Sequence, residues 1–276
     1  MSQKEWDTKK LFDRLLKNKT KKTYWEKVRE LQTRATQDVF DKCVELIQSS
    51  HAKERIIGVD VLAQLGLPPR PFLKETLKLY FEILKTEKEE AVIGSILFAI
   101  GHNHELLNKS QIEMVASFKK HTASFVREGV MFALLGINRQ IAIDTLIYLM
   151  DDKVAYIRNW ATFGIGDLIE KNNETIVTAL RKRIHDKNSE TRGEAILGLA
   201  KRKIAGIENV IKQELLHENH NSLLFKAIEE INGIQLLPLL KKNLKQSQQD
   251  KRVNALWIED LQDCIQQLSK YKKLQK

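Results

Sequence analysis

The chain is poor in the residues that interrupt helices or cross-link a fold. Its 276 residues include only 4 prolines and 12 glycines, so we expect long helices and exclude fibrous or disordered classes. The two cysteines, Cys43 and Cys264, lie far apart in helix-like segments. This argues against a disulfide framework and for reduced thiols in a cytoplasmic protein.

Long apolar runs are also missing. The longest stretch without a charged or strongly polar residue is Ala91 to Gly101, 11 residues, whereas a membrane-spanning helix needs roughly 20. The segment Met1 to Lys10 is charged and lacks the apolar core of a secretory signal. We therefore expect a cytoplasmic protein without a membrane span.

The net charge of +10 is concentrated at the two ends of the chain. Residues 1–34 hold 11 basic and 5 acidic residues, and residues 241–276 hold 9 and 4. The 206 residues between them carry 26 basic and 27 acidic residues. Binding to a nucleic acid duplex needs many phosphate contacts, so the neutral centre disfavours that function without excluding it.

An internal repeat organises the chain. It consists of an arginine, a small residue three positions on, an aliphatic residue seven positions on and then glycine or alanine, as in Arg158, Ala161, Ile165 and Gly166. Seven copies, some weak, start at residues 55, 90, 127, 158, 192, 224 and 252, at intervals of 35, 37, 31, 34, 32 and 28. A second amphipathic stretch precedes each copy, so each repeat is predicted to be a helical hairpin.

The strongest copies carry a resemblance to a known family. The pattern Asp152-x5-Arg158-x2-Ala161-x3-Ile165-Gly166, repeated from Asp186 through Arg192, resembles the HEAT-like repeats, in particular the short bacterial type named after the phycobilisome lyases. The resemblance is strongest over residues 120–202. It implies an all-α fold, a right-handed α-α superhelix (HEAT-like solenoid) of about seven helical hairpins. It also implies that aspartate and arginine at the turns tie successive repeats together, here Arg127, Asp152, Arg158, Asp186 and Arg192.

The ends of the chain differ from the repeats. We expect an N-terminal helical cap over residues 1–35, a solenoid over 36–269 and a basic C-terminal tail over 270–276. A cap would give the open end of a solenoid a polar outer face. The basic ends are interpreted as solvated surface, with phosphate binding as the alternative.

Enzyme chemistry finds little support in the sequence. HEAT-like deoxyhypusine hydroxylases hold two irons with His-Glu pairs on second helices, but His104-Glu105 and His217-Glu218 fall elsewhere. Alkylpurine DNA glycosylases of similar architecture have Trp-x-x-x-Asp, whereas Asp167 follows Trp160 by seven residues. We expect no catalytic residue, no metal and no cofactor. A DNA-binding or glycosylase-like protein, and a lyase-like or metal-dependent enzyme, are the alternatives.

The second helices are predicted to present a binding face. Positions one, two, five and nine after the repeat arginine point away from the core. Aromatic and acidic side chains gather at these positions in the three best copies: Glu128, Phe132, Asn159, Trp160, Phe163, Asp167 and Glu194. Aromatic anchors beside carboxylates suit a protein or peptide with basic groups. The alternative is that Trp160 and Phe163 pack between adjacent repeats.

Overall fold

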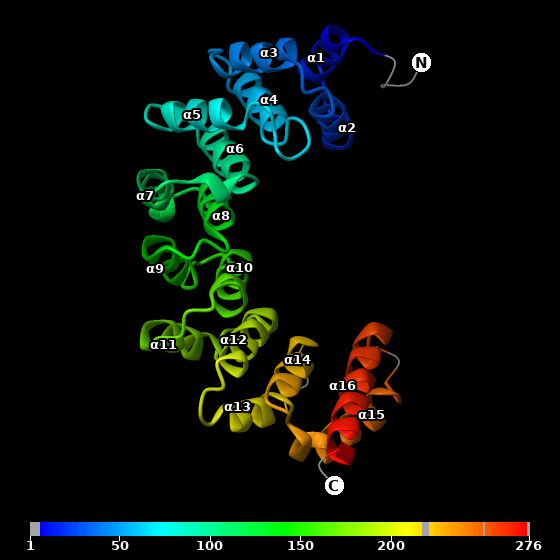
Figure 1. Ribbon diagram of the computed structural model, residues 1–276. Helices are drawn as coiled ribbons and strands as arrows, with labels where there is room; N and C mark the ends of the chain where they lie inside the picture. Colours follow the sequence, from blue (N-terminus) through cyan, green and yellow to red (C-terminus); the bar gives the residue numbers. More distant parts are fainter. Residues whose placement is uncertain (1–5, 217–220, 251, 275–276) are drawn as a thin grey trace. The chain divides into compact units, whose positions relative to one another are not determined.

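A computed structural model describes residues 6–216, 221–250 and 252–274 (Figure 1). All regular elements in these ranges are helical. The predicted all-α fold of HEAT-like helical hairpins is therefore confirmed. None of the helices in the described part of the chain is long and apolar enough to cross a membrane.

The chain divides into two compact units, Met1–Thr145 and Leu146–Lys276. The first unit contains eight α-helices within the described residues: α1 (Thr8–Leu16), α2 (Lys21–Gln32), α3 (Gln37–Ile47), α4 (Ala52–Leu62), α5 (Leu73–Leu84), α6 (Glu90–Gly101), α7 (Lys109–Ser117) and α8 (Ser124–Leu134). Two short 3-10 turns, η2 (His104–Leu106) and η3 (Phe118–Lys120), flank α7. Helix α9 (Gln140–Leu149) contains the boundary between the units.

The second unit continues the alternation of first and second helices. Its described elements are α10 (Ala155–Phe163), the π-helical turn η4 (Gly164–Leu168), α11 (Glu174–Arg183), α12 (Ser189–Lys201), α13 (Ile207–Glu214), α14 (Leu223–Glu230), the 3-10 turn η5 (Ile234–Leu236), α15 (Leu237–Ser247) and α16 (Ala255–Leu274).

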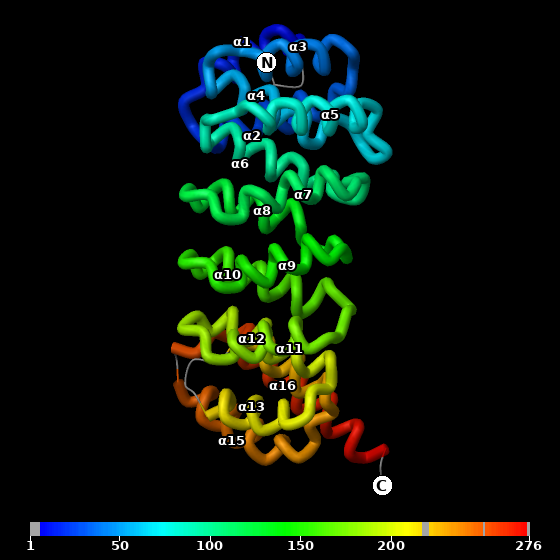
Figure 2. Tube along the Cα trace, turned by 90° about the vertical axis from the view of Figure 1, so that its left-hand side faces the viewer, coloured from blue at the N-terminus to red at the C-terminus, as the bar shows by residue number. Residues whose placement is uncertain are grey.

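Second helices stack on one another inside each unit. Helix α6 packs between α4 and α8, and α12 packs between α10 and α14 (Figure 1). The two helices of a hairpin, such as α7 and α8, lie side by side (Figure 2). Six of the seven predicted copies start within even-numbered helices from α4 to α14, whereas α16 begins at Ala255, three residues after the predicted start at Arg252.

The repeat arginine makes the same local contacts in four hairpins. The Nη1 atom of Arg158 donates to the backbone carbonyls of Asp152 and Lys153, six and five residues earlier. Equivalent bonds are made by Arg55, Arg127 and Arg192. These bonds satisfy carbonyl groups of the turn between the two helices, which would otherwise lack partners.

Arg55, Arg158 and Arg192 also reach the following repeat. Their guanidinium groups form ion pairs with a carboxylate at N–O distances of 2.8–2.9 Å: Arg55 with Glu87, Arg158 with Asp186, and Arg192 with Glu214. The Arg158 guanidinium and the backbone N–H of Asn188 hold the pKa of Asp186 below its usual value against the opposing effect of burial. Arginine suits this position because its planar fork bonds carbonyls and a carboxylate at once.

The sequence places Asp151-Asp152 and Asn188-Ser189 before two second helices, where such side chains are expected to cap the helix start, and the structure agrees only in part. Asn188 is the N-cap of α12, and its Oδ1 accepts from the backbone N–H of Thr191 at 2.8 Å. Helix α10 starts later than its aspartates suggest, with Val154 as N-cap. Asp152 instead accepts the backbone N–H of Val154 at 2.9 Å and so shapes the turn before the helix.

Glycine permits a close approach of backbones between second helices. A Cβ atom added to Gly198 on α12 would lie 2.7 Å from the Cα atom of Gly166 in η4. Such a distance requires the backbone to shift. The loss of helix propensity at this glycine, up to about 1 kcal/mol relative to alanine, is therefore offset by helix packing.

The N-terminal helices are part of a packed core. Helix α1 buries Leu11 and Leu15, helix α2 buries Val28 and Leu31, and both helices contact α4. The predicted boundaries of a cap at residue 35 and of a tail at residue 270 stay predictions.

Candidate functional site

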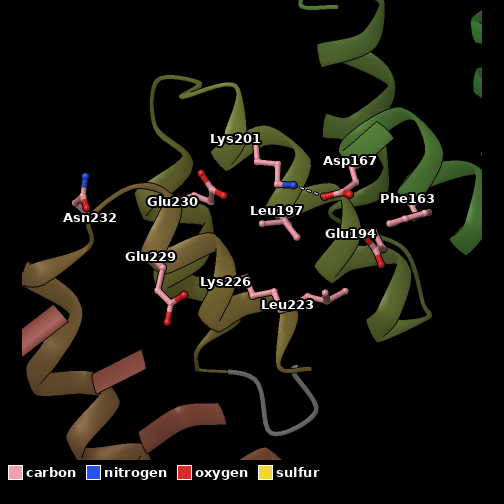
Figure 3. Close-up of a pocket in the computed structure, with 10 residues that line it drawn as sticks. All are labelled: Phe163, Asp167, Glu194, Leu197, Lys201, Leu223, Lys226, Glu229, Glu230 and Asn232. Atoms are coloured by element: carbon pink, nitrogen blue, oxygen red, sulfur yellow. Dashed lines mark hydrogen bonds and ion pairs between the residues drawn. The ribbon is translucent and has the colours of Figure 1, made fainter. Parts of the chain in front are cut away.

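A groove of about 680 Å³ lies in the C-terminal unit. It runs over the faces of η4, α12 and α14 (Figure 3). Three apolar, four acidic and three other polar side chains line it: Phe163, Leu197, Leu223, Asp167, Glu194, Glu229, Glu230, Lys201, Lys226 and Asn232.

The repeat register brings these residues to one face. Position five after the repeat start is Phe163 on α10, Leu197 on α12 and Glu229 on α14, and all three line the groove. Position nine supplies Asp167 and Lys201. Equivalent positions on adjacent second helices meet because the helices stack in register.

The π-helical turn sets the position of Asp167. Helix α10 continues at its carboxyl end into the π-helical turn η4. The half-buried guanidinium of Arg202 donates to backbone carbonyls there. The bonds to Gly166 and Ile165 measure 2.7 and 2.9 Å, and a further bond reaches Ile169. Arg202 also bonds Gly198 on its own helix at 2.9 Å. It therefore binds both sides of the junction between η4 and α12.

One carboxylate of the groove, that of Asp167, pairs with a lysine that also lines the groove. The Nζ atom of Lys201 forms an ion pair with Asp167, from α12 to η4 (Figure 3). With Lys226 as the second cation and four carboxylates, the lining of the groove carries a formal charge of −2. The groove therefore favours cations over anions.

Glu194 differs from the other acidic residues of the groove. Burial, followed by the nearby charge of Asp167, raises the pKa of Glu194 to about 7. Its carboxylate makes no hydrogen bond or ion pair with the residues that the structure describes. Burial likewise raises the pKa of Glu229 above its usual value, with Asp263 as the next cause. A half-buried carboxylate has lost part of its hydration. When no cation of the protein pairs with it, a cation of a ligand can do so favourably.

The aromatic residues of α10 form a stripe that leads to the groove. Trp160 is 38% exposed and meets Phe163 edge-on, with ring centroids 5.5 Å apart. Tyr156, one turn earlier, is 54% exposed and lies 6.1 Å from the Trp160 ring. Phe163 is half-buried and lines the groove, whereas Trp160 lies outside its lining. We name Tyr156, Trp160 and Phe163 the aromatic stripe.

Asn159, also on α10, is half-buried. Its Oδ1 atom is buried without a hydrogen-bond partner among the described residues. It does not line the groove.

Two predicted site residues belong to the other unit. Phe132 on α8 packs against Phe98 and His102, at centroid distances of 5.6 and 5.2 Å. Glu128, one turn before Phe132, is half-buried. Phe132 thus belongs to an aromatic cluster of the N-terminal unit, Glu128 lies in the same unit, and the other five predicted residues belong to the C-terminal unit.

Metal and thiol chemistry have no assembled site in the described part of the chain. No three His, Cys, Asp or Glu side chains come together there as a metal-binding group. The pair His217-Glu218 lies outside the described residues, and His104-Glu105 falls in η2. Burial raises the pKa of the Cys264 thiol to about 12, which favours the protonated thiol at neutral pH.

Helix α14 supplies lining residues that the sequence prediction missed: Leu223, Lys226, Glu229 and Glu230. The repeat copy that starts at Leu224 lacks the arginine from which positions one, two, five and nine are counted, so the pattern does not mark them on α14. The signal was nevertheless there, because positions two and five after Leu224 are Lys226 and Glu229.

Comparisons with known proteins support the architecture. The chain is 29% identical to the protein YibA of Escherichia coli K12 over 224 aligned residues. The alignment covers 77% of this chain and 76% of YibA. The crystal structure of YibA from E. coli aligns with a TM-score of 0.76 at 24% identity, over 97% of this chain and 94% of that one. No protein-family model matches the chain.

More distant solved structures share the fold. An archaeal HEAT-like repeat protein from Thermococcus onnurineus aligns at a TM-score of 0.54 and 12% identity, over 82% of this chain and 96% of that one. Kap95p, in a complex with RanGDP, aligns at 0.58 and 10% identity, over 93% of this chain and 40% of Kap95p. Together with the stacked hairpins described above, these matches establish that this chain has the fold of the HEAT-like repeat proteins.

Proposed function

We propose that the chain is a non-catalytic binding protein for a protein or peptide with basic groups. The observation that carries this proposal is the aromatic stripe of α10, in which Tyr156 and Trp160 are exposed and Phe163 lines an acidic groove. Exposed tryptophan and tyrosine side chains give large contact areas, and carboxylates beside them select cations. Trp160 and Phe163 act as anchors, and Glu194 selects the basic group, because Asp167 is already paired with Lys201.

The fold is compatible with a protein ligand. Kap95p, which aligns with 93% of this chain, binds RanGDP. We place the function in the cytoplasm, because Cys43 and Cys264 are both buried, free thiols.

Substitution of Trp160 tests the proposal. With a partner captured by the wild-type protein and then purified, we expect Trp160→Ala to weaken binding by about 30-fold, the loss typical of a binding hot spot. Glu194→Lys is expected to weaken it further, because it places a cation where the partner's cation binds. Isothermal titration calorimetry measures both effects.

Trp25→Ala is the matched control. Trp25 is 37% exposed, against 38% for Trp160, but lies in the N-terminal unit. Equal affinity of the two tryptophan variants for the partner would show that the stripe is not the binding surface. Thermal melts of the variants confirm that each is folded.

A further inference from the structure

The two ends of the groove differ in their chemistry. At one end, Asp167 and Glu194 lie close to Phe163, and at the other Glu229 and Glu230 lie on α14 (Figure 3). Leu197 and Leu223 lie between the two ends (Figure 3). The end at Glu194 combines an aromatic ring, an apolar wall, the Glu194 carboxylate and the ion pair of Asp167 with Lys201.

This combination fits the two parts of an arginine side chain. The aliphatic stem of arginine packs on apolar and aromatic surface while its charged head remains polar. The planar guanidinium offers five N–H donors, so it can bond carboxylates on two sides and stack on an aromatic ring. A lysine ammonium is a compact point charge, so it neither forms a two-pronged bond to a carboxylate nor stacks on an aromatic ring as a guanidinium does.

We propose that the end of the groove formed by Phe163, Asp167, Glu194 and Leu197 is a subsite for one arginine side chain of the partner, and that occupation of the subsite releases a proton. This inference rests on the proposed function, and it specifies the residue that the groove recognises and how pH controls the binding.

Proton release follows from the surroundings of Glu194. The charged groups that act on it are Asp167 from η4, Lys226 from α14, and Lys201 and Glu190 from its own helix. Burial and the Asp167 charge hold the pKa of Glu194 at about 7 in the free protein. A guanidinium beside the carboxylate favours its charged form and lowers that pKa. Between the two pKa values, binding therefore expels the proton, and affinity rises with pH.

Titration with N-acetylated hexa-arginine amide tests the inference. This probe has no group that titrates near pH 7. From pH 6 to pH 8 we expect its affinity for the wild-type protein to rise by about tenfold, the increase that one released proton produces. Calorimetry at pH 6.5 in two buffers of different ionisation enthalpy is expected to show the released proton directly.

The variant Glu194→Gln keeps the shape of the side chain and removes the titration. We expect it to bind the probe about tenfold more weakly at pH 8 and with no rise in affinity between pH 6 and pH 8. Glu170→Gln changes the net charge equally at an exposed residue outside the groove and is expected to behave as wild type. Acetylated hexalysine amide is expected to bind more weakly than hexa-arginine.

Three results would overturn the subsite: unchanged affinity of Glu194→Gln, a pH dependence that persists in this variant, or hexalysine binding as tight as that of hexa-arginine. The proposed function is tested separately. If Trp160→Ala still weakened the purified partner's binding while the hexa-arginine results failed, the binding surface would stand and the arginine subsite would fall. If Trp160→Ala did not weaken the partner's binding, both the proposed function and the arginine subsite would be wrong.

Discussion

Burial shifts the pKa values of individual side chains in this protein, as Tyr24 and Asp60 show. Tyr24 on α2 donates its hydroxyl to Asp60 on α4 at 2.6 Å, and the side-chain amide of Gln32 donates to the backbone carbonyl of Asp60 at 2.9 Å. Burial raises the pKa of Asp60 to about 6, although the Tyr24 hydrogen bond opposes the shift. Burial also raises the pKa of Tyr24 well above its usual value, so the tyrosine stays neutral and remains a donor.

The Tyr24 hydroxyl is expected to stabilise the folded state most where Asp60 is charged. The titration of Asp60 itself has the opposite trend. Because the pKa of Asp60 is higher in the folded than in the unfolded chain, its protonated carboxyl favours folding most below pH 4, and this contribution to the free energy of unfolding is lost as pH rises through about 6. Tyr24→Phe removes the donor to the carboxylate, so we expect it to lower the free energy of unfolding at pH 8 by about 2 kcal/mol, and by less at pH 5.

Urea unfolding at the two pH values measures this difference. Tyr271→Phe, which removes the hydroxyl of an exposed tyrosine on α16, is the control. An effect of Tyr24→Phe that is as large at pH 5 as at pH 8 would contradict the proposed link to Asp60 ionisation.

Between elements, the arginine contacts repeat with the period of the sequence. Each of the four repeat arginines bonds its own turn, and Arg55, Arg158 and Arg192 also pair with a carboxylate of the next repeat. The Arg158–Asp186 pair is well shielded, with side-chain exposures of 15% and 4%. This pair connects two successive hairpins, from α10 to the turn before α12.

We expect Arg158→Gln to destabilise the protein by about 2 kcal/mol at neutral pH, because it leaves Asp186 and the carbonyls of the turn with fewer partners. Since the pair lowers the pKa of Asp186, its stabilisation is complete above pH 4 and is lost as pH falls through the lowered value. Urea unfolding at pH 7 measures the change.

Arg181→Gln is the matched control for this prediction. Arg181 is an exposed arginine on α11, and its removal changes the net charge equally. Similar losses in the two variants would mean that charge, and not the contact between repeats, accounts for the effect.

For the whole molecule, the distribution of charge matters more than its total. The net charge of +10 comes from residues 1–34 and 241–276, while the groove is lined by more carboxylates than lysines. Tight duplex binding needs a continuous set of phosphate contacts, each of which adds to the salt dependence. The acidic groove offers none.

We therefore expect duplex DNA to bind no more tightly than the micromolar range of non-specific complexes at 0.15 M salt. Fluorescence anisotropy with a labelled duplex over a range of salt concentrations measures this. Nanomolar affinity with a steep loss on added salt would favour the DNA-binding alternative over the proposed function.

Part of the groove could be predicted from the sequence because the repeat register is local. The spacing from Arg158 and Arg192 identified Phe163, Asp167 and Glu194, all of which line the groove. Residues of α14 were missed because Leu224 replaces the repeat arginine, so the register was not extended to that helix. The exposure of Trp160 could not be predicted either, because helical periodicity does not tell which neighbour covers a side chain.

The sequence by itself determined the helical hairpins and their period, because these depend on hydrophobic spacing and on glycine, proline and capping residues within a few turns. Only the tertiary structure decided which carboxylate is paired and which is not. Asp167 meets Lys201, 34 residues later, through a π-helical turn held by Arg202, while Glu194 is half-buried with a pKa of about 7. Burial and long-range charge set these properties, and both depend on how the helices pack.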